Sequence, residues 1–308
     1  MSTPKLDRHS TTYPFIEPSR FTHALNGQAA LITGAGRGIG KAIALAFARA
    51  GANVICVSRT KQEIDLVVQQ IAEKDYAKAI AVCGDVSDDS DVCRIVAEAT
   101  KAFATVGILV NNAGIDRIGS LEHETNFLDW WRVFEVNMQG PAALTRHLLP
   151  KMVAQRQGVI IHIGSRNAIY NHPFMTAYSA SKAALLRFHQ CLHLELEGTN
   201  VQTFYLQPGD VTTSLMDGAS KSEEVLKLPR LQTLVADMRE TMDSGQSDSP
   251  DLAANTCVAL AADPDIHLLG GLYLDANQDL GQLLEHFRDS KENVIRGKRL
   301  YTMKVDLL

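Results

Sequence analysis

Short runs of β-branched and apolar residues alternate with longer segments of helical periodicity from Gly27 to about residue 280. Parallel strands need long crossovers, and segments of ten or more residues with helical periodicity supply them. The pattern therefore predicts an α/β fold, a doubly wound, seven-stranded parallel sheet with helices on both faces. The predicted strands are 29–33, 53–58, 79–83, 107–111, 158–163, 201–206 and 272–275.

The helical segments follow the same alternation. They are predicted at 38–50, 61–74, 90–104, 126–155, 176–197, 222–242 and 252–262. Pro141 lacks a backbone donor and clashes with the preceding turn, so we expect a kink or break in 126–155 near Gly140. Residues 243–251 are polar and are predicted to form a loop.

One domain is expected over residues 27–280, because a chain of 308 residues with 45% apolar side chains can bury one large core. Residues 1–26 mix proline, serine and charge without periodicity, so they are predicted to be an extension on the domain surface, outside the core. Residues 281–308 form a tail with enough apolar side chains to dock on the domain. These are Leu283, Leu284, Val294, Leu300, Tyr301 and Val305.

Net charge and composition indicate which classes of partner the protein can bind. The net charge of −5 and the 6% aromatic content offer no basic face or stacking surface for nucleic acid. The five cysteines lack the paired spacings of zinc or redox sites, which favours free thiols in a reducing compartment. Neither a signal-peptide core nor a run of membrane-spanning length is present, so we expect a cytoplasmic protein that binds a small molecule.

A glycine cluster follows the first strand and opens the first helix, with Gly34, Gly38 and Gly40 in the spacing Gly-x-x-x-Gly-x-Gly. Glycine tolerates positive φ and lets a pyrophosphate approach the backbone, and the helix N-terminus supplies free amides. This placement predicts a dinucleotide-binding turn that also includes Arg37 and Ile39.

The second strand ends in Ser58 and Arg59 rather than in a carboxylate. Dinucleotide folds that prefer NAD use a carboxylate here to bind the ribose 2′-hydroxyl. A hydroxyl and a guanidinium suit a 2′-phosphate, and Arg37 can reach the same group. We therefore favour NADP over NAD, although both arginines are also compatible with a merely solvated surface.

Tyr178 and Lys182 are four residues apart at the start of a helix, so both project from one face. A free tyrosine has a pKa near 10, and a nearby ammonium and an oxidised nicotinamide would stabilise the phenolate and lower that pKa. Ser165, at the end of the preceding strand, can donate a hydrogen bond to a substrate oxygen as charge develops there.

Together these motifs resemble the short-chain dehydrogenase/reductases over about residues 27–280, a family with a Rossmann fold. The resemblance also rests on further residues in the expected order. These are Asp85, Val86, Asn111, Asn112, Ala113, Gly114, Asn137, Pro208, Gly209 and Thr212.

The resemblance implies a role for each position. Tyr178 would be the general acid/base, Lys182 would lower its pKa and hold the nicotinamide ribose, Ser165 would orient the carbonyl, and Asn137 would support a water-linked proton relay. The remaining positions would contact the cofactor. Asp85 and Val86 would lie at the adenine, Asn112 and Gly114 would border the cofactor, and Val211 and Thr212 would hold the carboxamide. Ala113, Pro208 and Gly209 would also contact the cofactor.

The implied activity is that of an NADPH-dependent carbonyl reductase or secondary-alcohol dehydrogenase, acting as a homodimer or homotetramer. The long tail and the Tyr13-Pro14-Phe15 opening resemble extended members common in fungal secondary metabolism, which favours a lipophilic ketone as substrate. Two alternatives stay open: a redox-neutral enzyme with bound NADP, such as an epimerase, dehydratase or cyclase, and a non-catalytic NADP sensor.

Three further features are weighed. His189 and His193 are four residues apart on a helix, but no third ligand accompanies them, so no metal is expected. Residues 213–249 are predicted either to cover the active site as an apolar lid or to dock on the core. Polar side chains between Ser165 and Tyr178 are either substrate contacts or a solvated loop. They are Arg166, Asn167, Tyr170 and His172.

Overall fold

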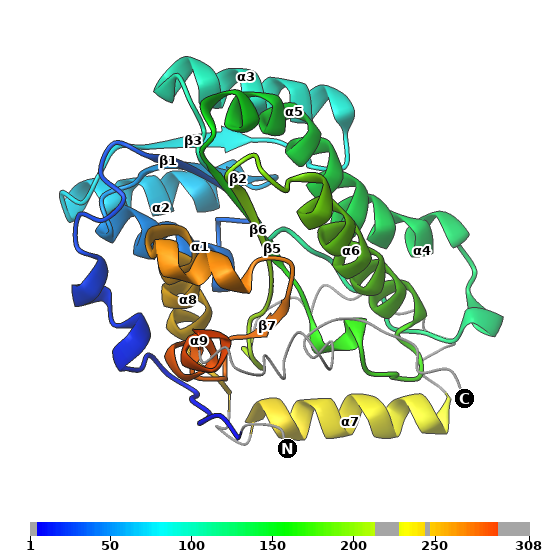
Figure 1. Ribbon diagram of the computed structural model, residues 1–308. Coiled ribbons are helices and arrows are strands. Elements are labelled where there is room, and N and C mark those ends of the chain that lie inside the picture. Colours follow the sequence, from blue (N-terminus) through cyan, green and yellow to red (C-terminus); the bar gives the residue numbers. More distant parts are fainter. Residues whose placement is uncertain (1–4, 213–227, 244–246, 289–308) are drawn as a thin grey trace.

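A computed structural model describes residues 5–212, 228–243 and 247–288 of the chain and contains one seven-stranded parallel sheet (Figure 1). Its strand order is β3-β2-β1-β4-β5-β6-β7. The predicted doubly wound α/β fold is therefore confirmed. The strands are β1 (Ala29–Thr33), β2 (Asn53–Ser58), β3 (Ala79–Cys83), β4 (Ile108–Asn111), β5 (Gly158–Ile163), β6 (Val201–Gln207) and β7 (Tyr273–Asp275).

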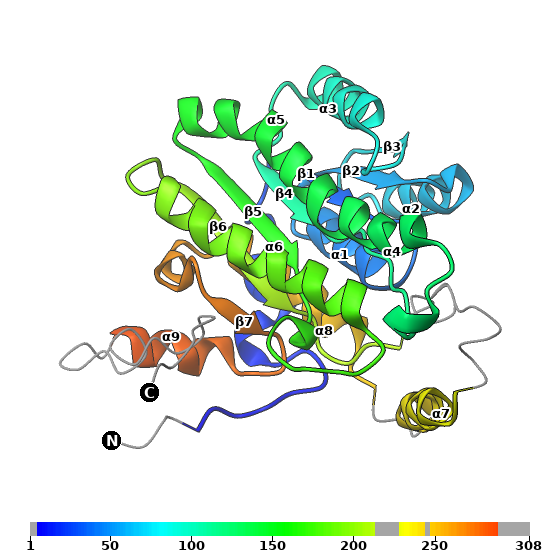
Figure 2. The same cartoon turned by 90° about the vertical axis from the view of Figure 1, so that its right-hand side faces the viewer.

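Helices cover both faces of the sheet (Figure 2). One face carries α1 (Gly38–Arg49), α2 (Lys61–Glu73) and α8 (Pro250–Ala262), and the other carries α3 (Asp89–Phe103), α5 (Gly140–Gln155) and α6 (Thr176–Glu195). Successive residues of a strand point to opposite faces. Ala30 and Ile32 of β1 accordingly join one buried cluster, and Ala29 and Leu31 join the other.

The predicted helix 126–155 departs from regular α-helix just before Gly140, near the expected position. It begins as α4 (Phe127–Phe134), widens into a turn of π-helix at Glu135–Gln139 and continues as α5. Pro141 has no N–H, so the helix lacks one backbone hydrogen bond there. A π turn is one way in which a helix accommodates a missing hydrogen bond. The chain keeps helical backbone angles at Gln139 and Gly140, so the helix is modified rather than broken.

Residues 5–26 contribute side chains to the core, so the expectation that the segment 1–26 lies outside the core is wrong for this described part. Two short 3₁₀ turns, Pro14–Ile16 and Pro18–Phe21, fold the segment against α8 and α9 (Leu280–Arg288). Such turns have no amphipathic period, so periodicity could not predict this burial. The buried apolar side chains of the segment are Leu6, Tyr13, Ile16, Phe21 and Leu25.

The described part of the C-terminal tail also packs on the domain. Leu283, Leu284 and Phe287 of α9 are buried, and the hydroxyl of Tyr13 accepts a hydrogen bond of 3.0 Å from the Leu280 amide. The other tail residues proposed to dock (Val294, Leu300, Tyr301 and Val305) lie outside the described residues. None of the helices in the described residues is both long enough and apolar enough to span a membrane.

Of residues 213–249, predicted to form either a lid or a segment docked on the core, the structure describes 228–243 and 247–249. Helix α7 (Pro229–Asp243) buries Leu231 against Ile118, with Leu228 beside them. Leu215, Met216, Val225 and Leu226, also proposed for the lid, lie outside the described residues. In the predicted polar loop, the side chain of Ser249 caps α8, which therefore begins at Pro250.

Candidate active site

A cavity of about 700 Å³ opens at the carboxyl ends of the strands, where the connections from β1 and β4 diverge to opposite faces of the sheet. Such a switch point is where open α/β sheets bind ligands. Every residue predicted to bind the cofactor lines this cavity, and so do Ser165, Tyr178 and Lys182. The residues predicted to bind the cofactor are Gly34, Arg37, Gly38, Ile39, Gly40, Ser58, Arg59, Asp85, Val86, Asn112, Ala113, Gly114, Pro208, Gly209, Val211 and Thr212.

The glycine turn is shaped by close backbone contacts. Gly34 and Gly38 have φ of +65° and +53°, which disfavour residues with a Cβ. A Cβ on Gly40 would lie 2.1 Å from the carbonyl oxygen of Gly34, so the helix start requires glycine. The Asn112 side chain donates a 2.8 Å hydrogen bond to the Thr33 carbonyl and so joins the ends of β4 and β1. Gly38, Ile39 and Gly40 at the start of α1 line the cavity.

The end of β2 combines two cations with a carboxylate. Arg37 and Arg59 both line the cavity, and so does Glu63 in the first turn of α2. Glu63 lies against the glycine turn, because a Cβ built on Gly36 would be 2.7 Å from its Oε2. Glu63 was not among the predicted site residues, because the prediction used the residues at the end of β2 and Glu63 belongs to α2, the helix that follows. This corner of the cavity therefore carries both positive and negative side chains.

The Asp85 carboxylate is held in place by the protein itself. Arg132 donates to it at 2.5 Å, the Ser87 amide donates at 3.0 Å, and Arg59 forms an ion pair with it at 3.9 Å. Burial raises the pKa of Asp85, but the Ser87 hydrogen bonds and the arginine charges outweigh burial and leave the pKa lowered. Asp85 is therefore a fixed negative charge at the cavity wall.

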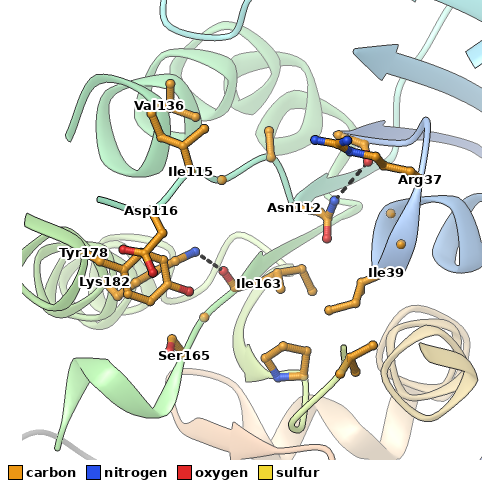
Figure 3. A pocket seen from close by; sticks show the side chains of 18 of the residues that line it. Arg37, Ile39, Asn112, Ile115, Asp116, Val136, Ile163, Ser165, Tyr178 and Lys182 are labelled. Atoms are coloured by element: carbon orange, nitrogen blue, oxygen red, sulfur yellow. Dashed lines mark hydrogen bonds between the residues drawn. The ribbon is translucent and has the colours of Figure 1, made fainter. Parts of the chain in front are cut away.

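Tyr178 and Lys182 project from the first turns of α6 toward the end of β5, where Ser165 lies (Figure 3). Both side chains are buried. The Lys182 ammonium donates a 2.9 Å hydrogen bond to the Ile163 carbonyl and is 5.7 Å from the centre of the Tyr178 ring. The three groups converge on one end of the cavity.

The protein's own groups raise the pKa of Tyr178, and the expected lowering by an oxidised nicotinamide stays a prediction. Burial raises the pKa of Tyr178 well above its ordinary value, the charge of Asp116 raises it further, and only a hydrogen bond from Ser165 lowers it. Burial lowers the pKa of Lys182 to about 8, and Asp116 partly opposes that shift. Without a bound cofactor, the phenol is therefore protonated at neutral pH rather than poised as a phenolate.

Asp116 is a second residue that sequence reasoning missed. It is buried, lines the cavity beside Tyr178 and Lys182 (Figure 3), and acts electrostatically on both. A signal was available, because an acidic residue two positions after the Asn111–Gly114 motif must lie at the carboxyl edge of the sheet.

Asn137 is the one predicted catalytic residue that does not line the cavity. It lies in the π turn, where its amide donates to the Ile115 carbonyl at 2.9 Å and to the Ser181 hydroxyl at 3.1 Å. Its oxygen accepts a 2.9 Å hydrogen bond from the Ile115 amide. In this arrangement Asn137 ties the loop after β4 to α6.

The opposite wall of the cavity is partly polar. Arg166, Asn167 and His172 line it, and Arg166 forms an ion pair with Asp210. Met175 and Leu234 add apolar surface, whereas Tyr170 is exposed and lies outside the lining. The wall can accept a ligand with both apolar and hydrogen-bonding parts.

The two histidines of α6 have other surroundings than a cluster of possible metal ligands in the part of the chain that the structure describes. His189 is buried and hydrogen-bonds Thr203 at 3.0 Å, and neither it nor His193 belongs to a metal-ligating group among the described residues. Among all the residues that the structure describes, one group has possible metal-ligand atoms within 4.8 Å of one another. It consists of Asp89 and Cys93 on α3 and His147 on α5. Both α3 side chains are exposed, and none of the three lines the cavity.

Comparisons with known proteins agree on one family. A family model described as "short chain dehydrogenase" matches residues 28–224. A short chain dehydrogenase of Pseudocercospora fijiensis (strain CIRAD86) is 38% identical over 299 residues, which cover 96% of this chain and 95% of that protein.

Solved structures resemble the chain over most of its length. One is a putative NAD(P)-dependent gluconate 5-dehydrogenase from Beutenbergia cavernae with bound NADP, which has a TM-score of 0.70 and 32% identity and covers 85% of this chain and 98% of its own. Another is a 3-ketoacyl-(acyl-carrier-protein) reductase from Brucella melitensis with NADH, which has a TM-score of 0.69 and 30% identity and covers 81% and 96%.

Proposed function

The chain belongs to the short-chain dehydrogenase family, and we propose that it is an NADPH-dependent carbonyl reductase that also runs as a secondary-alcohol dehydrogenase. The observation that carries the proposal is the convergence of Ser165, Tyr178 and Lys182 on one end of a cavity whose other end is a glycine turn. A family oxidoreductase with this arrangement has both a proton donor and space for a dinucleotide.

The cavity fits a dinucleotide. Glycine at 34 and 40 lets the turn pack closely against Asn112 and the backbone at the end of β1. The start of α1 lines the cavity, and the first amides of a helix can bind a pyrophosphate. Arg37 and Arg59 supply positive charge for a 2′-phosphate. Glu63 opposes them, and Asp85 forms an ion pair with Arg59 at 3.9 Å, so the preference for NADPH requires the two arginines to outweigh both carboxylates.

The proposed mechanism assigns one task to each residue. NADPH held by the glycine turn, Arg37 and Arg59 would supply a hydride for the carbonyl carbon. Ser165 donates a hydrogen bond to the carbonyl oxygen, and Tyr178 gives that oxygen its proton. The raised pKa of Tyr178 keeps it in the protonated form that reduction requires. The Lys182 ammonium stabilises the phenolate that remains after the transfer.

The substrate, assembly and location are also proposals. We propose a lipophilic ketone of secondary metabolism, for which Met175 and Leu234 supply apolar wall. The enzyme is proposed to act as a homodimer or homotetramer, in keeping with the exposed aromatic face of α4. Five free thiols suit a reducing compartment, so the proposed location is the cytoplasm.

The test is the loss of nicotinamide absorbance when the protein meets a panel of lipophilic ketones with NADPH or NADH. We expect consumption, with NADPH preferred. Tyr178→Phe should retain NADPH affinity and lose turnover by about 10²-fold or more. Arg59→Ala should weaken NADPH far more than NADH, and Glu63→Gln should strengthen NADPH alone.

Each part of the proposal can fail separately. Full turnover in Tyr178→Phe would contradict its role as the acid, and equal losses for both cofactors in Arg59→Ala would remove the phosphate argument. Product formation without net consumption of NADPH would identify a redox-neutral enzyme. NADPH binding with no product from any ketone would favour a sensor.

A further inference from the structure

Tyr205 of β6 is a fully buried tyrosine outside the cavity lining, directly behind the catalytic end. Its ring fills the space over Gly164, where a Cβ would lie 2.1 Å from the Tyr205 Cε1. It also stacks on Tyr273 of β7, with 5.6 Å between the ring centres. Glycine at 164 is thus needed for the Tyr205 ring to reach this place.

The Tyr205 hydroxyl contacts both elements that carry the proposed catalytic groups. It accepts a 3.1 Å hydrogen bond from the backbone amide of Ser165, at the end of β5. The same hydroxyl can donate to the Lys182 carbonyl of α6 at 3.3 Å or to the Ser165 carbonyl at 3.4 Å. One oxygen atom from a third element therefore lies between the strand end and the helix.

We infer that Tyr205 is a positioning residue for the catalytic groups, because its hydroxyl holds the Ser165 backbone against the turn of α6 that carries Lys182. The expected effect on kcat rests on the proposed function, whereas the structural link to Ser165 does not. Tyr205 touches neither the cavity nor a reacting atom, so it acts through Ser165.

The neighbouring contacts explain why this link matters. The Ser165 hydroxyl already accepts a 3.1 Å hydrogen bond from the Asn167 amide and also hydrogen-bonds Tyr178, so its direction depends on where the Ser165 backbone lies. The Lys182 ammonium reaches back to Ile163, two residues before Ser165, at 2.9 Å. Tyr205 and the Lys182 ammonium thus tie the same strand end to α6 from two sides.

The test compares Tyr205→Phe with Tyr273→Phe. Both substitutions remove one hydroxyl from the same aromatic stack and keep the ring, and among the described contacts only the Tyr205 hydroxyl reaches Ser165 and Lys182. We expect Tyr205→Phe to lower kcat by about 10-fold or more, since small displacements of reacting groups are costly. The dissociation constant for NADPH should stay within about twofold, because the pyrophosphate turn is untouched.

A second readout does not need turnover. Hydrogen exchange of the Ser165 amide should accelerate in Tyr205→Phe and stay unchanged in Tyr273→Phe, because only the first loses the acceptor of that amide. The inference is overturned if exchange at Ser165 matches the wild type, or if both variants lose the same fraction of kcat.

The two readouts separate this inference from the proposed function. If the wild-type enzyme reduces no carbonyl, the proposed function fails, and exchange at Ser165 alone decides whether Tyr205 holds the strand end. If the wild type turns over and Tyr205→Phe keeps both full kcat and slow exchange, the positioning role fails while the reductase proposal stands.

Discussion

At the scale of single residues, Asp116 acts electrostatically on two of the proposed catalytic groups. It adds a negative charge beside a buried tyrosine and a buried lysine, and it raises the pKa of both. For Tyr178 this adds to the effect of burial, whereas for Lys182 it opposes burial. Asp116 thus keeps the phenol protonated and the amine charged over a wider pH range.

We predict that Asp116→Asn moves the alkaline limb of kcat/KM for carbonyl reduction to lower pH. Reduction needs a protonated Tyr178 and a charged Lys182, so activity falls as pH rises through the lower of the two pKa values. In the free enzyme that value is about 8, for Lys182. Removing the carboxylate lowers it further, because the ammonium loses a favourable charge.

The measurement is kcat/KM between pH 6 and pH 10, which reports the free enzyme. Asp65→Asn is the control, because Asp65 pairs with Lys61 on the surface of α2 and does not line the cavity. An alkaline limb that stays in place or moves to higher pH in Asp116→Asn would contradict the assigned role.

At the scale of elements, the N-terminal segment shows how burial can arise without periodicity. Ile16 and Leu25 are fully buried, and the segment closes over α8 beside α9. Backbone contacts join the segment to the region after β7, such as His9 to Asn277 at 2.7 Å. The segment is thus part of the packed core of the domain, and we expect it to contribute to the stability of the domain.

We predict that Ile16→Ala lowers the free energy of unfolding by about 2–5 kcal/mol, because it leaves a cavity in the core. Leu66→Ala is the matched control on the exposed face of α2, where we expect a change of at most about 0.5 kcal/mol. Urea and thermal unfolding measure both variants. Equal losses of stability in the two would show that the N-terminal segment is not part of the cooperative core.

At the scale of the whole molecule, one helix leaves an apolar face uncovered. Phe127, Leu128 and Trp131 of α4 are exposed, with Leu128 at 77%. The rings of Phe127 and Trp131 stack with those of Trp130 and Phe134, with ring centres 5.1–6.3 Å apart. Exposed apolar patches of this kind mark contact surfaces, and a second copy of the chain is the occupant that the homo-oligomer proposal requires.

We predict that Leu128→Asp shifts the protein toward monomer, because the new carboxylate would be desolvated in the contact. Sedimentation velocity at several concentrations measures the shift. Leu66→Asp, also on an exposed leucine but on α2, should leave the assembly unchanged. Wild-type protein that sediments as a monomer at every concentration would end the homo-oligomer proposal.

Local patterns in the sequence determined most of the scaffold. Strand and helix periods are properties of neighbouring residues, so the strands were predicted to within one residue at each end. The glycine turn, the Tyr178 and Lys182 pair, and Ser165 each have a local signature, and the order of parallel strands brings their strand ends to one edge. Their roles in catalysis stay predictions.

Only the tertiary structure decided what depends on contacts between distant segments. Tyr205 meets Ser165 and Lys182 across 40 and 23 residues of sequence. Ile16 is buried against helices that come more than two hundred residues later, and the effect of Asp116 on two pKa values depends on its burial beside them. Periodicity and motifs describe neighbours along the chain, whereas burial, charge coupling and positioning depend on neighbours in space.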